Sequence, residues 1–102
     1  MPSQLYPQRP GDFKLRKENR RVKNALRKEG ARRKEEYEEA ISSIRRNPFR
    51  HPSNPLGINH LKGSWLCLWR FKLGRYRIIY EVDSESREFE ILYYGPRGGL
   101  YS

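Results

Sequence analysis

The spacing of apolar residues changes once along this chain, near Leu61, and that change is the strongest constraint on its fold. Before Leu61, apolar residues recur every three to four positions; after it, they alternate with polar ones. The first spacing is typical of helices, and the second is typical of strands with one buried face. We therefore predict an α+β fold, with an N-terminal α-hairpin packed on a small antiparallel sheet.

A strong helical pattern spans residues 31–46. Its apolar positions follow the i, i+3, i+4, i+7 spacing and are Tyr37, Ala40, Ile41 and Ile44. Asn47-Pro48 should end this helix, because a residue before proline avoids the helical conformation. A thinner apolar stripe predicts a first helix from Phe13 to Gly30, with Asp12 as its N-cap. The outer surface of this α-hairpin is basic.

Three alternating stretches follow a proline-rich loop that we predict over residues 47–60. The positions predicted to face the helices are Trp65, Cys67, Trp69, Phe71 and Leu73, then Tyr76, Ile78, Tyr80 and Val82, then Phe89, Ile91 and Tyr93. A turn at residues 83–86 joins the last two stretches. Three strands with such short connections indicate an antiparallel meander.

The balance of charge points to an anionic partner. The net charge is +10 over 102 residues, and residues 1–50 hold 15 Lys and Arg against 7 Asp and Glu, a net of +8. A field of this size favours polyanions through counterion release and faster encounter.

Composition also excludes several classes of protein. The single Cys67 rules out a disulfide framework and suggests a reducing cytoplasm, and no apolar run is long enough to span a membrane. With one cysteine and two histidines we expect no metal site and no cofactor, and we interpret His51 and His60 as loop residues. We predict one domain over residues 1–102, with an irregular proline-rich arm at 1–12.

Cations gather on the other side of the predicted sheet. Arg70 and Lys72 lie two residues apart on one strand, so their side chains point the same way. Arg77 lies on the next strand, across the short connection from Leu73 to Tyr76, within cross-strand reach. A solvated basic face is the simpler interpretation of any one of them. However, like charges held close together are unfavourable without an anion, which makes the cluster more suggestive than its members.

Such a cluster suits an RNA phosphodiester. Attack by the neighbouring 2′-hydroxyl builds negative charge on phosphorus, and positioned guanidinium groups stabilise that charge. Arg97 and Tyr101 follow Gly95-Pro96 and are expected to fold back over the end of the third strand. A tyrosine there offers a plane on which an unstacked base can rest.

The stretch from Leu61 to Tyr101 resembles the RelE/ParE toxin superfamily. The matching residues, in order, are Leu61-Lys62-Gly63, an aromatic-basic strand, Gly74-Arg75-Tyr76-Arg77-Ile78-Ile79-Tyr80, Gly95-Pro96-Arg97 and Tyr101. Two helices followed by three strands also fit the compact fold of this superfamily.

The resemblance implies roles for the site residues. RelE-like toxins are ribosome-dependent endoribonucleases, and in their pattern Arg70, Lys72 and Arg77 match the residues that stabilise phosphate and transition state. Arg97 matches the residue that assists the leaving group. Tyr101 matches the residue that orients the nucleotide and shares in proton transfer. We assign Lys72, Arg77, Arg97 and Tyr101 to catalysis, and Arg70, Lys72 and Arg75 to substrate binding.

The resemblance also implies partners. A toxin of this kind is neutralised by a cognate acidic antitoxin, acts on mRNA at the ribosome, and meets operator DNA only through the antitoxin complex. No membrane partner is expected. ParE-like members share the fold but inhibit DNA gyrase without nuclease activity, and this is the alternative function. A member that has lost activity and only binds nucleic acid or antitoxin is a third.

Overall fold

The computed structural model describes residues 13–61 and 68–96, which form two helices and a five-stranded sheet. In chain order the elements are β1 (Lys14–Glu18), α1 (Arg20–Arg27), α2 (Ala31–Arg46), β2 (Ile58–His60), β3 (Leu68–Leu73), β4 (Tyr76–Asp83) and β5 (Glu88–Pro96). The strands lie side by side in the order β1-β5-β4-β3-β2. β1 runs parallel to β5, and the other neighbouring strands are antiparallel.

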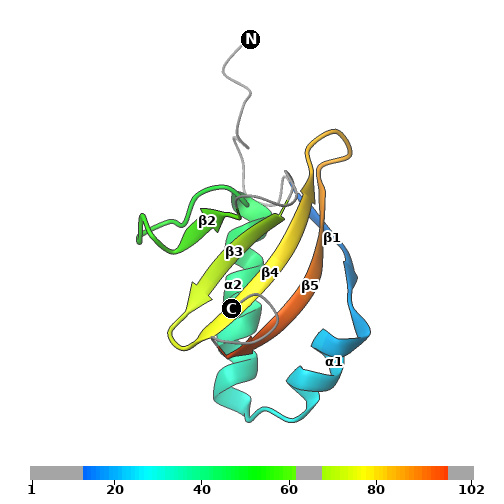
Figure 1. Cartoon of the computed structure of the whole chain (residues 1–102), viewed down its shortest axis with the longest axis vertical. Coiled ribbons are helices and arrows are strands. Elements are labelled where there is room, and N and C mark those ends of the chain that lie inside the picture. Colours follow the sequence, from blue (N-terminus) through cyan, green and yellow to red (C-terminus); the bar gives the residue numbers. More distant parts are fainter. Residues whose placement is uncertain (1–12, 62–67, 97–102) are drawn as a thin grey trace.

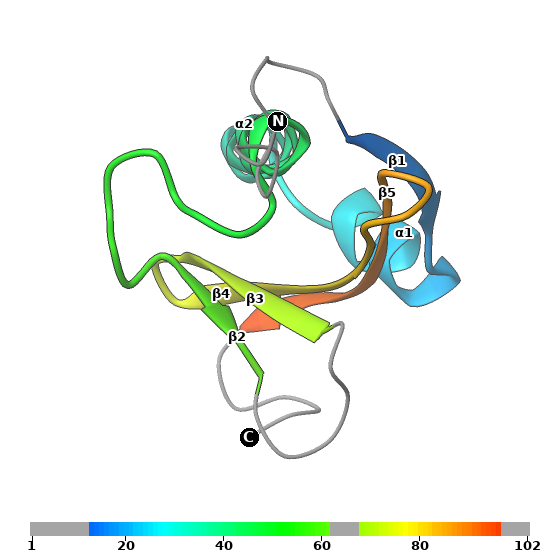
Figure 2. The same cartoon turned by 90° about the horizontal axis from the view of Figure 1, so that it is seen from above.

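The two helices lie on one side of the sheet (Figures 1 and 2). α2 crosses the sheet, whereas α1 lies beside β5 at the β1 end. This arrangement confirms the predicted α+β fold with a helical hairpin on a mainly antiparallel sheet. We call the face of the sheet that α2 does not cover the open face.

α2 forms where the sequence predicts it. Its apolar stripe is buried against the sheet, with Tyr37, Ala40, Ile41 and Ile44 each at most 3% exposed. The helix ends at Arg46, and Asn47 adopts an extended conformation before Pro48, as expected for a residue that precedes proline.

The first strand lies where we predicted a helix, and that part of the prediction is wrong. Residues Lys14–Glu18 pair with β5, and Leu15 packs against the core. Tertiary pairing overrides a weak local preference here, because the composition of this segment is helical but its apolar stripe is thin. α1 starts only after Asn19, whose side chain accepts a hydrogen bond from the backbone N–H of Arg21 at 2.8 Å. Asp12, the predicted N-cap, lies outside the described residues.

A short strand also interrupts the predicted loop. Ile58–His60 pairs with β3, although residues 47–60 were predicted to be loop throughout. Three residues are too few to give a clear alternating pattern. The strand forms because Ile58 is buried in the core and faces Phe71 across the ladder.

Three buried tyrosines connect the sheet to the rest of the core. Tyr80 donates to the carbonyl of Pro48 and Tyr37 donates to Glu18 Oε2 at 2.7 Å. Burial raises the pKa of both phenols above the usual value, and for Tyr37 the hydrogen bond and charge of Glu18 add to the effect. Burial also raises the pKa of Tyr94 to about 12. All three therefore stay neutral in the folded protein over the ordinary pH range.

Trp69 packs against the core from a partly exposed position. Trp65, Cys67 and the arm at residues 1–12 lie outside the described residues. Neither of the described helices is long and apolar enough to cross a membrane.

Candidate functional site

A tight hairpin fixes the register of the two strands that carry the cations. Leu73 pairs with Tyr76, which leaves only Gly74 and Arg75 in the turn. Gly74 has φ of +61°, a conformation that L side chains rarely adopt, so glycine suits the first position of this two-residue turn. The register places Lys72 directly opposite Arg77.

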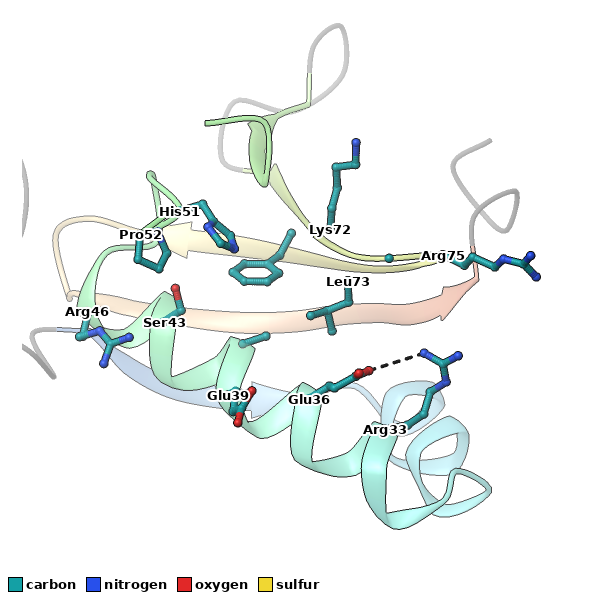
Figure 3. A pocket seen from close by; sticks show the side chains of 13 residues that line it. Arg33, Glu36, Glu39, Ser43, Arg46, His51, Pro52, Lys72, Leu73 and Arg75 are labelled. Carbon is teal, nitrogen blue, oxygen red and sulfur yellow. Dashed lines mark ion pairs between the residues drawn. The ribbon is translucent and has the colours of Figure 1, made fainter. Parts of the chain in front are cut away.

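Three cations share the open face of this hairpin. Arg70 and Lys72 are on the same side of β3, and Arg77 is their neighbour on β4. Figure 3 shows Lys72 pointing away from α2. This agrees with the expectation that the three side chains share a face. Within the described residues, neither Arg70 nor Lys72 forms an ion pair with a carboxylate.

Arg77 also supports the turn itself. Its Nη1 donates to the carbonyl oxygens of Gly74 at 2.7 Å and Tyr76 at 3.0 Å. A guanidinium has five N–H donors in a fixed plane, so it can hold the turn and still present donors to a ligand. Replacing Arg77 would therefore affect the hairpin as well as the open face.

Arg70 lies in a less solvated part of the face. Its Nε is buried and has no hydrogen-bond partner among the described residues. Arg70 faces Ile79 across the ladder, and Ile79 and Leu68 are buried although they lie outside the main core cluster. A buried donor without a partner is unfavourable, and an acceptor that reached this Nε would remove that cost.

Tyr93 belongs to this face, so the prediction that it faces the helices is wrong. β4 and β5 pair Tyr80 with Ile91 but Ile79 with Tyr93, so Leu92 is an extra residue in β5. Such a β-bulge shifts the alternation by one residue. Tyr94 consequently faces the helices, 4% exposed, and stacks on Tyr76 with ring centroids 5.2 Å apart.

The ring of Tyr93 lies over Gly95, the residue opposite Arg77. A Cβ on Gly95 would be 2.5 Å from the Tyr93 hydroxyl oxygen and 2.9 Å from Cζ. The hydroxyl donates to the Pro96 carbonyl at 3.3 Å. A phenol is thus held in the same cross-strand row as Lys72 and Arg77. The sequence offers one hint of this placement. Tyr93 and Tyr94 are adjacent, so in a strand one of them must face away from the helices.

The remaining predicted residues lie elsewhere. Arg75 is exposed in the turn and points away from the body of the molecule, rather than along the strand face (Figure 3). Arg97 and Tyr101 lie outside the described residues, so their positions relative to the cluster stay predictions.

The two histidines support local structure. His51 Nδ1 accepts hydrogen bonds from the backbone N–H groups of Ser53 and Asn54, and its ring packs against Phe71. This agrees with the loop role that we predicted for His51. His60 lies in β2, not in a loop, and its ring contacts Trp69, whose side chain is on the helix side of the sheet. Within the described segments, no three His, Cys, Asp or Glu side chains are close enough to hold a metal ion.

A cleft of about 610 Å³ lies on the opposite side of the sheet, between α2 and β3 (Figure 3). Its lining includes carboxylates and guanidinium groups from α2, namely Arg33, Glu36, Glu39 and Arg46. Arg33 lies 3.6 Å from Glu36 and stacks over the Tyr76 ring at 4.1 Å. The cleft therefore carries both signs of charge, whereas Arg70 and Lys72 on the open face form no ion pair with a carboxylate of the described residues.

The arrangement on the open face can bind and polarise a phosphate. Lys72 and Arg77 supply adjacent positive charge, Arg70 supplies a partly desolvated guanidinium, and Tyr93 supplies a phenol beside them. Glu81 and Glu90 lie farther along the same face, opposite Leu68, so the cationic region is limited to the hairpin end.

Two comparisons place the chain among known proteins. A family model described as the ParE toxin of the type II toxin–antitoxin system parDE matches residues 14–98. A chain of the archaeal RelE–RelB complex from Pyrococcus horikoshii superimposes with a TM-score of 0.71 and is 26% identical. That match covers 86% of this chain and 98% of the other.

A second solved structure shares the fold. It is a chain of the RelBE2 toxin–antitoxin complex from Mycobacterium tuberculosis, with a TM-score of 0.68 and 19% identity over 90% of this chain and 97% of that one. Comparison with curated proteins gave no match. The family match covers most of the described chain and confirms the resemblance to the RelE/ParE superfamily. The protein therefore belongs to the ParE toxin family of type II toxin–antitoxin systems.

Proposed function

We propose that this toxin is a ribosome-dependent mRNA endoribonuclease that inhibits translation, with its substrate phosphate bound on the open face. One observation carries the proposal: Arg70, Lys72 and Arg77 lie together on this face, and the buried Nε of Arg70 has no described partner. A row of like charges is unfavourable alone and becomes favourable when a phosphate neutralises it.

The chemistry is a transesterification within the RNA. The 2′-oxygen attacks the adjacent phosphorus, the bond to the 5′-oxygen breaks, and the products are a 2′,3′-cyclic phosphate and a 5′-hydroxyl. Arg70, Lys72 and Arg77 would stabilise the negative charge that develops on the phosphate oxygens. Following the superfamily pattern, Arg97 would assist the departing 5′-oxygen and Tyr101 would orient the nucleotide.

Arginine stays protonated in proteins, so these residues are unsuited to accept the 2′-hydroxyl proton. Tyr93 pairs with Ile79, and its ring lies over Gly95, the residue opposite Arg77, so we propose that it orients a ribose hydroxyl or stacks on a base. No described histidine is on the open face to act as the base. Positioning within the ribosomal decoding site would then supply much of the rate, in keeping with the ribosome dependence implied by the superfamily.

A cognate antitoxin is the second partner that we propose. Both solved relatives are toxin–antitoxin complexes, which supports such a partner for this chain. An acidic segment that folds on binding would suit the cations of the open face, and it would compete there with mRNA. Operator DNA would be bound only through the toxin–antitoxin complex.

The nuclease proposal is tested by mapping mRNA ends in cells after brief induction. Wild-type protein should produce new 5′ ends inside translated frames, and Arg70→Gln/Lys72→Gln should reduce their abundance at least tenfold. These two positions are better probes than Arg77, whose guanidinium also holds the turn. Lys34→Gln/Arg45→Gln removes the same charge from exposed positions on α2 and should cut like wild type. Intact mRNA after induction of a folded, toxic wild-type protein would rule the nuclease out.

A second function has its own support. The matching family model is that of the ParE toxin. As the superfamily resemblance implies, ParE-like members inhibit DNA gyrase without cutting RNA. In that case induction should cause DNA damage and filamentation while mRNA stays intact. The Arg70→Gln/Lys72→Gln variant would then remain toxic if these residues are structural, so the same strains distinguish the two functions.

A further inference from the structure

In the segment from β1 to the end of α2, the net positive charge is confined to the first half. Residues 14–28, which include β1 and α1, hold eight Lys and Arg against the single Glu18, a net charge of +7. Residues 29–46, which include α2, hold five Lys and Arg against five Glu, a net charge of zero. Most of the protein's net charge of +10 therefore belongs to β1, α1 and the residues beside them.

Ion pairing makes this contrast sharper. On α2, Arg32 and Arg33 are within 4.0 Å of glutamates, so much of their field is neutralised locally. On β1, Arg16 contacts Asp83, Glu88 and Glu90. The seven other cations of residues 14–28 form no ion pair with a carboxylate of the described structure; they are Lys14, Lys17, Arg20, Arg21, Lys23, Arg27 and Lys28.

Four of these unpaired cations line one hollow, which we call the β1–α1 surface. Its volume is about 520 Å³, and its lining residues are Lys17, Glu18, Asn19, Arg20, Lys23, Asn24 and Arg27. Arg20, Lys23 and Arg27 follow the i, i+3, i+7 spacing, so they form a stripe about 10 Å long on α1. The stripe is on the side of the helix opposite the buried Val22. The one acid, Glu18, accepts a hydrogen bond from Tyr37.

We propose that the β1–α1 surface binds the phosphate backbone of double-helical RNA, at a site separate from the open face. The inference rests on the proposed function in one respect, since an enzyme that works on the ribosome would meet RNA rather than DNA. Lysine, arginine and asparagine side chains are the groups that contact phosphate and sugar in nucleic-acid complexes. Double-helical RNA is recognised mainly through its backbone and shape.

The lining of the surface favours this ligand over others. A protein partner usually needs buried aromatic or aliphatic anchors, and the apolar residues of α1 face inward. Within the described residues the large exposed apolar side chain is Leu56, in the loop before β2. Single-stranded RNA usually stacks its bases on aromatic rings, and none lines this hollow. Backbone contact by cations needs neither feature.

The surface is also placed to act together with the open face. α1 lies on the helix side of the sheet at the β1 end, whereas the cations of the open face lie on the β3–β4 hairpin. A structured RNA held by α1 would leave the open face available for a single-stranded message.

The test is fluorescence anisotropy with a labelled RNA duplex of about 20 base pairs, measured between 50 and 300 mM KCl. Arg20→Gln/Lys23→Gln/Arg27→Gln should weaken binding at least tenfold at 100 mM KCl. It should also lower the slope of log affinity against log salt by about three, roughly one for each lost phosphate contact. Glutamine keeps a helix propensity close to those of lysine and arginine, so α1 should still form.

Two controls separate a specific surface from net charge. Arg32→Gln/Lys34→Gln/Arg45→Gln removes the same charge from α2 and should change the slope by less than one. Arg20→Lys/Arg27→Lys keeps the charge and should bind like wild type, which guards against loss of fold in the triple variant. Equal losses in the two triple variants would overturn the proposal, as would duplex binding that the β1–α1 triple variant leaves unchanged.

A further measurement tests the class of ligand. Poly-glutamate peptide should bind much more weakly than the duplex, and equal affinity with the same dependence on the β1–α1 cations would show a protein-binding surface instead. These assays involve no cleavage. If the protein binds the duplex through α1 but leaves mRNA intact, only the proposed nuclease function is wrong. If it cuts mRNA but binds the duplex without the α1 cations, only the proposed β1–α1 binding surface is wrong.

Discussion

Gly95 positions Tyr93 because glycine has no side chain. The phenol ring of Tyr93 lies on the backbone of Gly95, in the space that a Cβ would occupy. Because Gly95 pairs with Arg77, this contact holds the Tyr93 hydroxyl beside the cation row. Gly95 is not in the left-handed region, so its value here is space rather than backbone freedom.

The contact predicts a clear pattern in a double-mutant cycle. Gly95→Ala in the wild type should push the Tyr93 ring away and break its hydrogen bond to Pro96, at a cost of about 1 kcal/mol in unfolding free energy. In a Tyr93→Ala background the same change should cost nothing or stabilise, since alanine loses less chain entropy than glycine. Urea denaturation of the four proteins measures the coupling. Equal effects of Gly95→Ala in both backgrounds would show that the two residues act independently.

At the scale of elements, local pattern predicted α2 well and β1 poorly. α2 has a wide apolar stripe and a proline stop, so its limits follow from its own residues. β1 is held by partners distant in sequence: it pairs with β5, and Arg16 contacts carboxylates on β4 and β5. These partners lie more than 60 residues away along the chain, so the residues near position 16 give no sign of them. The helical composition of the segment therefore gave the wrong element.

The candidate site was predictable only as far as the alternation held. Arg70 and Lys72 share a strand and Arg77 follows a two-residue turn, so their common face can be read from spacing. The bulge at Leu92 cannot, because nothing in β5 marks an extra residue. It moved Tyr93 from the predicted core to the open face and Tyr94 in the opposite direction.

Arg16 should stabilise the β1 edge in a salt-dependent way. It approaches Glu88 at 3.4 Å, Glu90 at 3.5 Å and Asp83 at 3.8 Å, with 38% of its side chain exposed. Arg16→Gln should reduce the unfolding free energy by about 0.5–1 kcal/mol at 50 mM KCl and by less at 1 M KCl. Urea denaturation at the two salt concentrations measures this.

Arg32 provides the matched control for that experiment. It is paired with Glu36 at 3.8 Å, but its side chain is 91% exposed. Arg32→Gln should leave the unfolding free energy nearly unchanged at both salt concentrations. If both substitutions behave alike, Arg16 does not hold the edge strand.

Over the whole molecule, the buried tyrosines predict instability in alkali. An unfolded tyrosine loses its proton near pH 10, whereas burial raises the pKa of Tyr37 and Tyr80 in the folded state. Above pH 10 the unfolded chain therefore binds fewer protons than the folded one, and stability must fall as pH rises. The stabilisation is fully present below pH 10.

The size of this effect can be measured by urea denaturation between pH 8 and 11.5. Each phenol should contribute a slope of up to about 1.4 kcal/mol per pH unit above pH 10. Tyr37→Phe/Tyr80→Phe should be less stable than wild type at pH 8, because it leaves Glu18 and the Pro48 carbonyl without their hydrogen bonds. It should also lose stability less steeply in alkali. Parallel curves for the two proteins would refute this account.

The charges of the described residues at the two ends of β5 differ, which predicts an electric dipole moment along this strand. α1, with its unpaired cations, lies at one end of this strand, and the connection between β4 and β5 lies at the other (Figure 1). Residues 81–90 around that connection carry five acids and one base, Arg87, and Arg16 of β1 pairs with three of these acids without neutralising them all. In the field of a polyanion such a molecule turns as it diffuses, so that collisions occur preferentially with α1 leading. Association of macromolecules is usually slowed because most collisions occur in the wrong orientation. Orientation before contact would raise the fraction of productive collisions.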